Sequence, residues 1–250
     1  MRIIPLASSS KGNAYVVEQG DAALLVDCGV GIRRLKAAYD VTRLRGVLIT
    51  HNHIDHISGL RSVAKAIDAP VFANSMTAES AAAMLELDTI PFACFENGQE
   101  FEVGPFSVTP FSIPHDAADP VGYVIRGDET YFHATDVGTP LASIGVHLSE
   151  ADAATLESNH DPVMLRTSGR PPSLIQRISG PRGHLSNDQA CGLVRDFAKP
   201  RLKRLWLAHL SQDCNAPHLA LNAMKATLAA MNRADVELAV APSGVDARGR

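Results

Sequence analysis

The first half of the chain consists mainly of short apolar runs separated by turn residues. Runs at 14–18 and 22–27 flank a Gln-Gly-Asp turn and predict a β-hairpin, and the run at 47–50 predicts a buried strand. Between residues 60 and 67, apolar side chains fall three and four residues apart, which is the spacing of one helix face. The remaining runs predict a helix at 77–87 and strands at 71–73, 101–103, 106–111, 121–125 and 131–134.

The second half alternates between apolar runs and helical segments. Ser186 followed by Gln189 forms a capping box, which predicts the start of a helix that continues through Ala198. Residues 166–183 are rich in Pro, Gly and Ser and predict a loop that holds one helical turn at 174–177. The other patterns predict a helix at 217–231 and strands at 153–157, 205–209 and 236–240.

The order of these elements predicts the fold class. Both halves mix hairpins with strand-helix-strand units, and no linker divides them. We therefore expect residues 1–250 to form a single α/β domain in which two mixed β-sheets lie between outer helices. The tail from about residue 244 is expected to fray.

Composition limits the classes of protein. The 250 residues are 46% hydrophobic and 20% charged, as in an ordinary globular protein, and no apolar run is long enough to cross a bilayer. The start of the chain lacks the long apolar segment of a secretory signal, and the four cysteines show no CxxC spacing, so we expect reduced thiols in the cytoplasm. Because the net charge is −4, any attraction for nucleic acid has to be local.

Four residues of metal-ligating type lie within six positions, between a predicted strand and a predicted helix: His51, His53, Asp55 and His56. Residues two apart on an extended chain point the same way, so His51 and His53 can converge on one ion. Asp55 and His56 then turn toward a second ion. Imidazole and carboxylate groups are common ligands of zinc-like metals, so metal-dependent chemistry is the first hypothesis.

This segment resembles the HxHxDH motif of the metallo-β-lactamase-fold hydrolases, whose fold is a four-layer αββα sandwich. Later motifs of that family match His115 after a strand, Asp136 after the next hairpin and His209 at the end of a late strand. The resemblance implies two divalent metal ions, zinc or else manganese. It assigns a first ligand set of His51, His53 and His115, a second set of Asp55, His56 and His209, and a bridging Asp136. Asp27 matches a further signature and is expected to orient the ligands.

Other segments are similar to the YycJ/WalJ-like branch of bacterial proteins, at 8–14, 156–161, 183–187 and 208–211. This resemblance implies a metal-dependent phosphodiesterase that hydrolyses nucleic acid, as a DNA exonuclease, through a water activated by two metal ions. The motifs of the second half also resemble ribonuclease Z, in which a catalytic His precedes a helix and a ligand His follows the next strand. His184 and His209 match those two places.

The chemistry implied by the resemblance needs a nucleophile and a proton donor. Two cations would turn a bridging water into hydroxide and hold the attacking and leaving oxygens of a phosphodiester. Asp55 would orient this nucleophile, and His184 would protonate the leaving oxygen, because a His outside the metal shell titrates near neutral pH. His160 is a second catalytic candidate, and its alternatives are a phosphate contact, an extra ligand or a structural residue.

Two segments are candidates for substrate binding. The similarity across 8–14 suggests that four of its residues face the site, although such residues also form ordinary turns: Ser9, Ser10, Lys11 and Asn13. Residues 166–183 contain four arginines and no Asp or Glu. We therefore expect Arg166 and Arg177 to contact phosphate, with a solvated loop as the alternative interpretation.

Other functions fit the same residues. A small-molecule metallohydrolase acting on a cyclic phosphodiester, a thioester or a lactone could use the same metal centre, because the fold does not decide between them. A di-iron oxidoreductase is disfavoured, since it would typically carry Glu at the position of His53. Nothing in the sequence indicates a membrane or an obligate protein partner.

Overall fold

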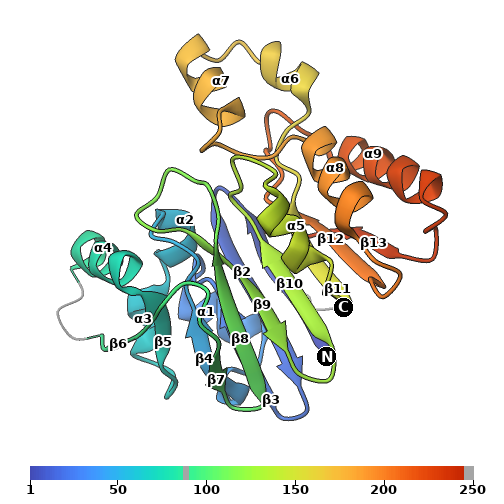
Figure 1. Ribbon diagram of the computed structural model, residues 1–250. Helices are drawn as coiled ribbons and strands as arrows, with labels where there is room; N and C mark the ends of the chain where they lie inside the picture. The colour runs from blue at the N-terminus through green and yellow to red at the C-terminus, as the bar shows by residue number, and fades with distance from the viewer. Residues whose placement is uncertain (87–89, 245–250) are drawn as a thin grey trace.

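The computed structural model describes residues 1–86 and 90–244 of the chain. Two β-sheets lie face to face with helices on their outer sides (Figure 1). The first sheet has the strand order β1 (Arg2–Ser9), β2 (Gly12–Gln19), β3 (Ala22–Val26), β4 (Leu44–Leu48), β5 (Val71–Asn74) and β6 (Phe92–Phe95). The second has the order β13 (Glu237–Val240), β12 (Arg204–Ala208), β11 (Ala153–Glu157), β10 (Thr130–Ala134), β9 (Val121–Arg126), β8 (Phe106–Ser112) and β7 (Phe101–Val103).

The helices divide between the two sheets. Against the first sheet lie α1 (Ile32–Ala38), the 3-10 helix η1 (Val41–Arg43), α2 (Ile54–Ile57), α3 (Leu60–Ala64) and α4 (Ser75–Leu85). Against the second lie α5 (Ala142–Leu148), α8 (Asn187–Phe197) and α9 (Pro217–Ala230). Helices α6 (Pro162–Arg166) and α7 (Pro172–Ser179) form an arm that stands away from the sandwich (Figure 1). The predicted αββα architecture with two mixed sheets is confirmed.

Alternate residues of a strand belong to different cores, because side chains along a strand point to opposite faces of the sheet. In β2, Tyr15 and Val17 lie in the core between the two sheets. Ala14 and Val16 instead pack beneath the helices of the first sheet. Burial on both faces explains why the strands appear in the sequence as continuous apolar runs rather than as an alternating pattern.

The strand directions bring the carboxyl ends of seven strands to the same edge of the two sheets. Strands β1 and β3 are antiparallel to β2, and β4 is parallel to β3. Strands β8 and β10 are antiparallel to β9, while β11 and β12 continue parallel to β10. The carboxyl ends of parallel strands meet at the same edge of a sheet, which is where α/β folds collect functional loops. Most of the predicted site residues follow these ends.

Several predicted elements are confirmed with small shifts in their bounds. The hairpin of β2 and β3, the series from β7 to β10, and the capped helix α8 all lie where the sequence predicts them. The side chain of Ser186 accepts a hydrogen bond from the Gln189 amide, as the capping box requires. The end of the predicted helix at 77–87 and residues 245–250 of the predicted tail lie outside the described residues.

Other elements were not predicted. Strand β1 was not predicted because Pro5 interrupts its apolar pattern. The structure tolerates this proline because β1 is the edge strand of its sheet, and the pairing register with β2 shifts next to Pro5. The helical turn expected at 174–177 is present but longer than predicted, because α7 makes two turns there and begins with Pro172 at its first position. Strand β6 and helix α5 were also missed. None of the described helices is long and apolar enough to cross a membrane.

Candidate active site

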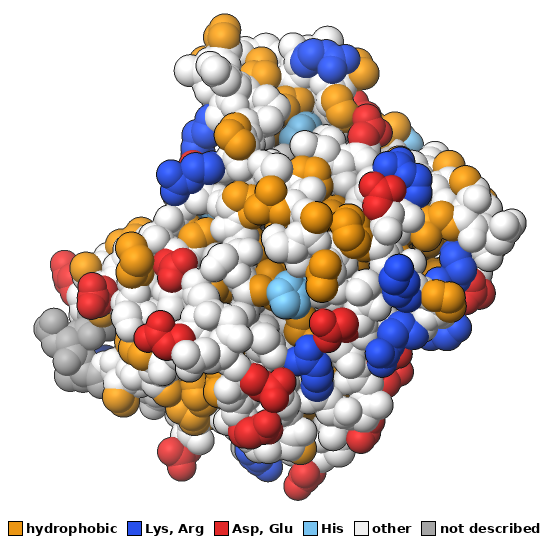
Figure 2. All heavy atoms as spheres, viewed as in Figure 1, with side chains coloured by type: hydrophobic (Ala, Val, Ile, Leu, Met, Phe, Trp, Pro, Cys, Tyr) orange, Lys and Arg blue, Asp and Glu red, His pale blue; other side chains and the backbone are white. Residues whose placement is uncertain are grey.

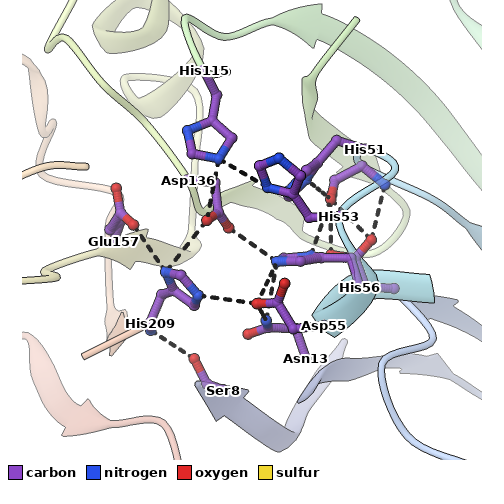
Figure 3. A network of polar contacts seen from close by, with 12 residues as sticks. Ser8, Asn13, His51, His53, Asp55, His56, His115, Asp136, Glu157 and His209 are labelled. Carbon is purple, nitrogen blue, oxygen red and sulfur yellow. Dashed lines mark hydrogen bonds and ion pairs between the residues drawn. The ribbon is translucent and has the colours of Figure 1, made fainter. Parts of the chain in front are cut away.

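The histidine motif changes direction between β4 and α2. The chain is extended at His53, and α2 begins at the next residue, so that His53 is its N-cap. The rings of His51 and His53 therefore lie on one side, with centroids 4.7 Å apart. The first turn of α2 carries Asp55 and His56 around to a different position, and Figure 3 shows the side chains converging.

A first donor cluster consists of His51, His53 and His115, with one ring nitrogen of each within 4.8 Å of the others. His115 Nδ1 donates to the Gly183 carbonyl at 2.9 Å, which leaves Nε2 to face His53 Nδ1 at 3.3 Å. Burial lowers the pKa values of His51 and His115, and so favours the neutral imidazole that binds metals. The buried Nε2 of His51 has no hydrogen-bond partner in the described structure.

A second donor cluster consists of Asp55, His56 and His209. Asp55 Oδ2 lies 3.5 Å from the Nε2 atoms of both histidines. The Nε2 atom of His209 is buried and has no hydrogen-bond partner among the described residues. An unpaired buried nitrogen is costly unless something occupies its lone pair. Each cluster therefore contains a buried imidazole nitrogen that has no hydrogen-bond partner among the described residues.

Asp136 lies between the two clusters. Its Oδ2 atom is 3.1 Å from His56 Nε2 and its Oδ1 atom is 3.7 Å from His115 Nε2. Burial would raise the pKa of Asp136, but His209 and His56 outweigh it and hold that pKa well below the usual range. One charged carboxylate thus contacts a member of each cluster.

Three residues in the loops at this edge of the sheets adopt a left-handed backbone conformation, which is uncommon for residues other than glycine. The φ angles are 59° for Asp27, 59° for Asp136 and 54° for His209. Such conformations cost roughly 1–2 kcal/mol each and tend to occur at functional sites. Each follows a strand that ends at this edge, so the unusual backbone lies where the chain directs a polar side chain inward.

Asp27 orients the ring of His56, a member of the second cluster. Its Oδ2 atom accepts a hydrogen bond from His56 Nδ1 at 2.7 Å, so that His56 Nε2 faces Asp55 and Asp136. Its Oδ1 atom accepts hydrogen bonds from the amide and the hydroxyl of Thr50, both at 2.9 Å. These are the contacts expected of a carboxylate that orients a ligand.

Glu157 is a site residue that the sequence reasoning missed. It ends β11, is fully buried, and accepts hydrogen bonds at Oε1 from Nδ1 of His184 at 2.9 Å and Nδ1 of His209 at 3.1 Å. Oε2 accepts from the amides of Val137 and Leu185. Burial alone would raise the pKa of Glu157, but the His184 charge and these hydrogen bonds lower it to about 2. An acid at the end of an apolar strand was the available signal, since buried carboxylates need partners.

The two catalytic histidine candidates differ in position. The His184 ring centroid lies 5.0 Å from that of His115, and its side chain is 18% exposed. Burial would lower the pKa of His184, but Glu157 outweighs it and raises that pKa. His160 is buried and belongs to none of the donor clusters among the described residues. Its carbonyl accepts from the Asn187 amide, which ties it to the start of α8.

The first candidate substrate segment meets the site through Asn13. Asn13 Nδ2 donates to Asp55 Oδ2 at 3.1 Å and lies 3.0 Å from His56 Nε2. Ser9 is buried and donates to the Ser243 carbonyl, whereas Ser10 and Lys11 are exposed. Ser8, which the sequence reasoning did not select, accepts from the His209 amide at 2.7 Å.

The arginine segment is less cationic than its sequence suggests. Arg177 Nε lies 2.7 Å from Asp116 Oδ2, and Arg170 lies 2.8 Å from Asp213. Acids from distant parts of the chain therefore compensate two of the four positive charges of this segment. Arg166 is exposed and has no ion pair among the described residues. Figure 2 shows the arm of α6 and α7 rising above the rest of the surface.

Asp116 is a second site residue that was missed. Besides its ion pair with Arg177, its Oδ1 atom lies 3.4 Å from His115 Nε2 and 3.9 Å from His53 Nε2. The available signal was its position directly after His115 in the sequence. Through this carboxylate, the arm contacts the edge of the first donor cluster.

Comparisons with known proteins agree with this geometry. A family model described as a β-lactamase superfamily domain matches residues 23–210. An exodeoxyribonuclease YycJ from Bacillus anthracis is 33% identical over 222 residues, which cover 86% of this chain and 84% of that protein. A ribonuclease Z from Methanopyrus kandleri is 32% identical over 108 residues, or 40% of this chain and 39% of that protein.

Solved structures show the same fold. The metallo-β-lactamase fold protein YhfI from Bacillus subtilis superimposes with a TM-score of 0.74 at 19% identity, covering 97% of this chain and 96% of that one. The donor clusters occur at the strand ends of this shared fold, and relatives that match most of the chain are hydrolases. The chain belongs to the β-lactamase superfamily and is a metal-dependent hydrolase with the metallo-β-lactamase fold.

Proposed function

We propose that the protein is a metal-dependent exodeoxyribonuclease that uses two divalent metal ions. The observation that carries the proposal is the convergence of seven His and Asp side chains in which buried atoms of His51, Asp136 and His209 lack hydrogen-bond partners among the described residues. The relative that matches 86% of the chain is named an exodeoxyribonuclease, which supports DNA as the substrate.

The donor set fits two ions of borderline character. His51, His53 and His115 would hold one ion, Asp55, His56 and His209 would hold the other, and Asp136 would bridge them. Five imidazoles and two carboxylates favour zinc, with manganese as the alternative. Bound ions of this kind polarise a phosphodiester and lower the pKa of water, so that a nucleophile forms near neutral pH. Asp55 would also orient the attacking water.

His184 would supply the proton that the leaving oxygen needs. Its Nδ1 donates to Glu157, so Nε2 is the atom left to donate to a substrate. Glu157 also holds His209 through Nδ1, and so connects the proposed proton donor to a proposed ligand. His160 remains a second candidate donor or phosphate contact.

The pH dependence of activity should reveal the Glu157–His184 pair. A raised pKa keeps His184 protonated to higher pH, so activity that needs this proton falls only as the pH rises through that raised pKa. In Glu157→Gln the imidazolium loses its charged partner, and the alkaline decline of kcat/KM should move to lower pH. Profiles of the wild type, this variant and Glu79→Gln, an exposed control, would be compared at equal metal content. An unmoved alkaline decline would contradict the assignment.

We keep Ser9, Ser10, Lys11 and Asn13 as proposed substrate contacts, together with Arg166 and Arg177 on the arm. Replacing Arg166 and Arg177 by Ala should weaken DNA binding and reduce the salt dependence of log K by about 0.7 for each phosphate that is no longer bound. Arg166 should contribute more, because Asp116 already pairs with Arg177. Binding would be measured over a range of salt concentrations with exposed Lys225→Ala as the control. If the salt dependence of log K is the same in all of these proteins, the arm does not bind phosphate and is an ordinary solvated surface.

We also propose a cytoplasmic location. The four cysteines, Cys28, Cys94, Cys191 and Cys214, form no disulfide. Three of them are buried as ordinary core residues, as is usual for proteins of reducing compartments.

A substrate panel tests the proposed function. The protein would be incubated with labelled single- and double-stranded DNA and RNA, a cyclic phosphodiester, a thioester and a lactone, with zinc, manganese or a chelator. We expect DNA to be degraded in the presence of metal and protected by the chelator. Turnover of the thioester or lactone without degradation of nucleic acid would overturn the proposal and favour a small-molecule metallohydrolase.

A further inference from the structure

A basic hollow lies outside the donor clusters, beside the loop between β1 and β2. It measures about 420 Å³, and its lining includes Lys11, Gly29, Arg33, Arg34, Ser58 and Ser62. Three of the lining residues are cationic and none is acidic. Lys11 is already a proposed substrate contact, but the proposed metal centre and the arm leave the other cations of this surface unexplained.

The floor of the hollow is fixed to the loops of the donor clusters. The Gly29 amide donates to the Asn13 carbonyl at 2.8 Å, and the Cys28 amide donates to the His56 carbonyl at 2.7 Å. A Cβ atom on Gly29 would lie 1.7 Å from the Asp55 carbonyl oxygen, so only glycine permits this approach. The hollow therefore holds a constant position relative to Asp55 and His56.

The cations of the hollow are available to a ligand. Lys11, Arg33 and Arg34 are exposed, and none forms an ion pair within the described residues. Arg170 and Arg177 of the arm, by contrast, are already paired with acids. Guanidinium groups bind phosphate oxygens in a bidentate manner. The hydroxyls of Ser58 and Ser62 instead bond the backbone, donating to the carbonyls of Gly29 and Gly59. The lining thus has the chemistry of a site for phosphate.

The hollow is also close enough to the donor clusters to share a substrate with them. Lys11 is two residues from Asn13 in the sequence, so their Cα atoms are at most about 7 Å apart. Asn13 Nδ2 in turn lies 3.1 Å from Asp55 Oδ2. A nucleic-acid strand carries one phosphate for each nucleotide, so a strand bound at the metal centre would bring its neighbouring phosphates close to this hollow.

We propose that the hollow formed by Lys11, Arg33 and Arg34 binds the phosphates of a single nucleic-acid strand next to the phosphodiester being cleaved. This inference rests on the proposed nuclease function. It gives the net-acidic protein a local positive site, and it places the strand on the side of the metal centre where α1 begins.

The test compares two double variants that each remove two positive charges. Arg33→Ala/Arg34→Ala changes the hollow, whereas Lys36→Ala/Lys65→Ala changes exposed lysines that do not line it. The probe is single-stranded DNA with phosphorothioate linkages, which keeps its charges and resists hydrolysis, bound to the metal-loaded protein over a range of salt concentrations. The hollow variant should reduce the salt dependence of log K by about 1.4, or 0.7 per contact, and the lysine variant should match the wild type.

Metal content and melting temperature would verify that both double variants fold. Equal salt slopes in the two variants, with normal DNA binding by the wild type, would overturn the inference and leave the proposed function intact. If the wild type itself does not bind the DNA, the proposed function fails and the inference fails with it. These two results are distinguished by the wild-type measurement alone.

Discussion

Removal of the Asp136 carboxylate should empty the proposed metal centre and abolish hydrolysis. Asp136 is the acid that contacts a member of each donor cluster, at 3.1 Å from His56 and 3.7 Å from His115. Loss of a residue that only orients a ligand costs about 10- to 100-fold in metal affinity, so loss of the bridging ligand itself should cost more than about 100-fold. His53→Ala should likewise lower metal occupancy.

Asp136→Asn is the sharpest form of this experiment. Asn tolerates the left-handed backbone that Asp136 adopts, so the substitution removes the charge without straining the turn. Asp128→Asn is the matched control, because Asp128 is exposed and lies outside the donor clusters. Metal analysis and a DNA hydrolysis assay would be made on each protein. Full metal occupancy with undiminished activity in Asp136→Asn would refute the ligand assignment.

His184→Ala should retain the bound metal and the affinity for DNA but lose about 10²- to 10⁴-fold in turnover, the usual range for a general acid. The side chain of His184 is partly exposed, and its Nδ1 donates to Glu157. His184 also lies within ligand distance of Asp136, Glu157 and His209, so metal analysis of the variant is part of the test. The loss should be smaller on a nitrophenyl phosphodiester, since nitrophenolate is a weak base that leaves without a proton.

Turnover on both substrates separates catalysis from structural support. His218→Ala, at an exposed position on α9, provides the control. An equal loss on DNA and on the nitrophenyl diester, or the loss of a metal ion, would show that His184 supports the site rather than donating a proton. His160 would then be the next candidate to replace.

The sequence could predict those features that local spacing and strand ends determine. His51 and His53 are two residues apart on extended chain, and the structure places their rings together. The strands from β7 to β10 appear as apolar runs with turn residues between them, and they form as expected. Strand β1 was invisible for the opposite reason, because its pattern contains Pro5 and its stability comes from pairing with β2.

Contacts between distant segments could not be read from the sequence. Asp116 and Arg177 are 61 residues apart, and neither position indicates that their side chains form an ion pair. Glu157 and His209 are 52 residues apart, and their contact depends on the neighbouring positions of β11 and β12 in the sheet. The basic hollow similarly needs the β1–β2 loop, α1 and the end of α2 to be brought together in space.

One titration tests the central claim most directly. Metal-free protein would receive increasing zinc or manganese while the bound metal and the products from end-labelled single-stranded DNA are both measured. Our account predicts that nucleotides are released progressively from an end of the strand, and that activity rises until two metal ions are bound per chain. DNA hydrolysis that persists in excess chelator, or metal-saturated protein that leaves DNA intact, would contradict it.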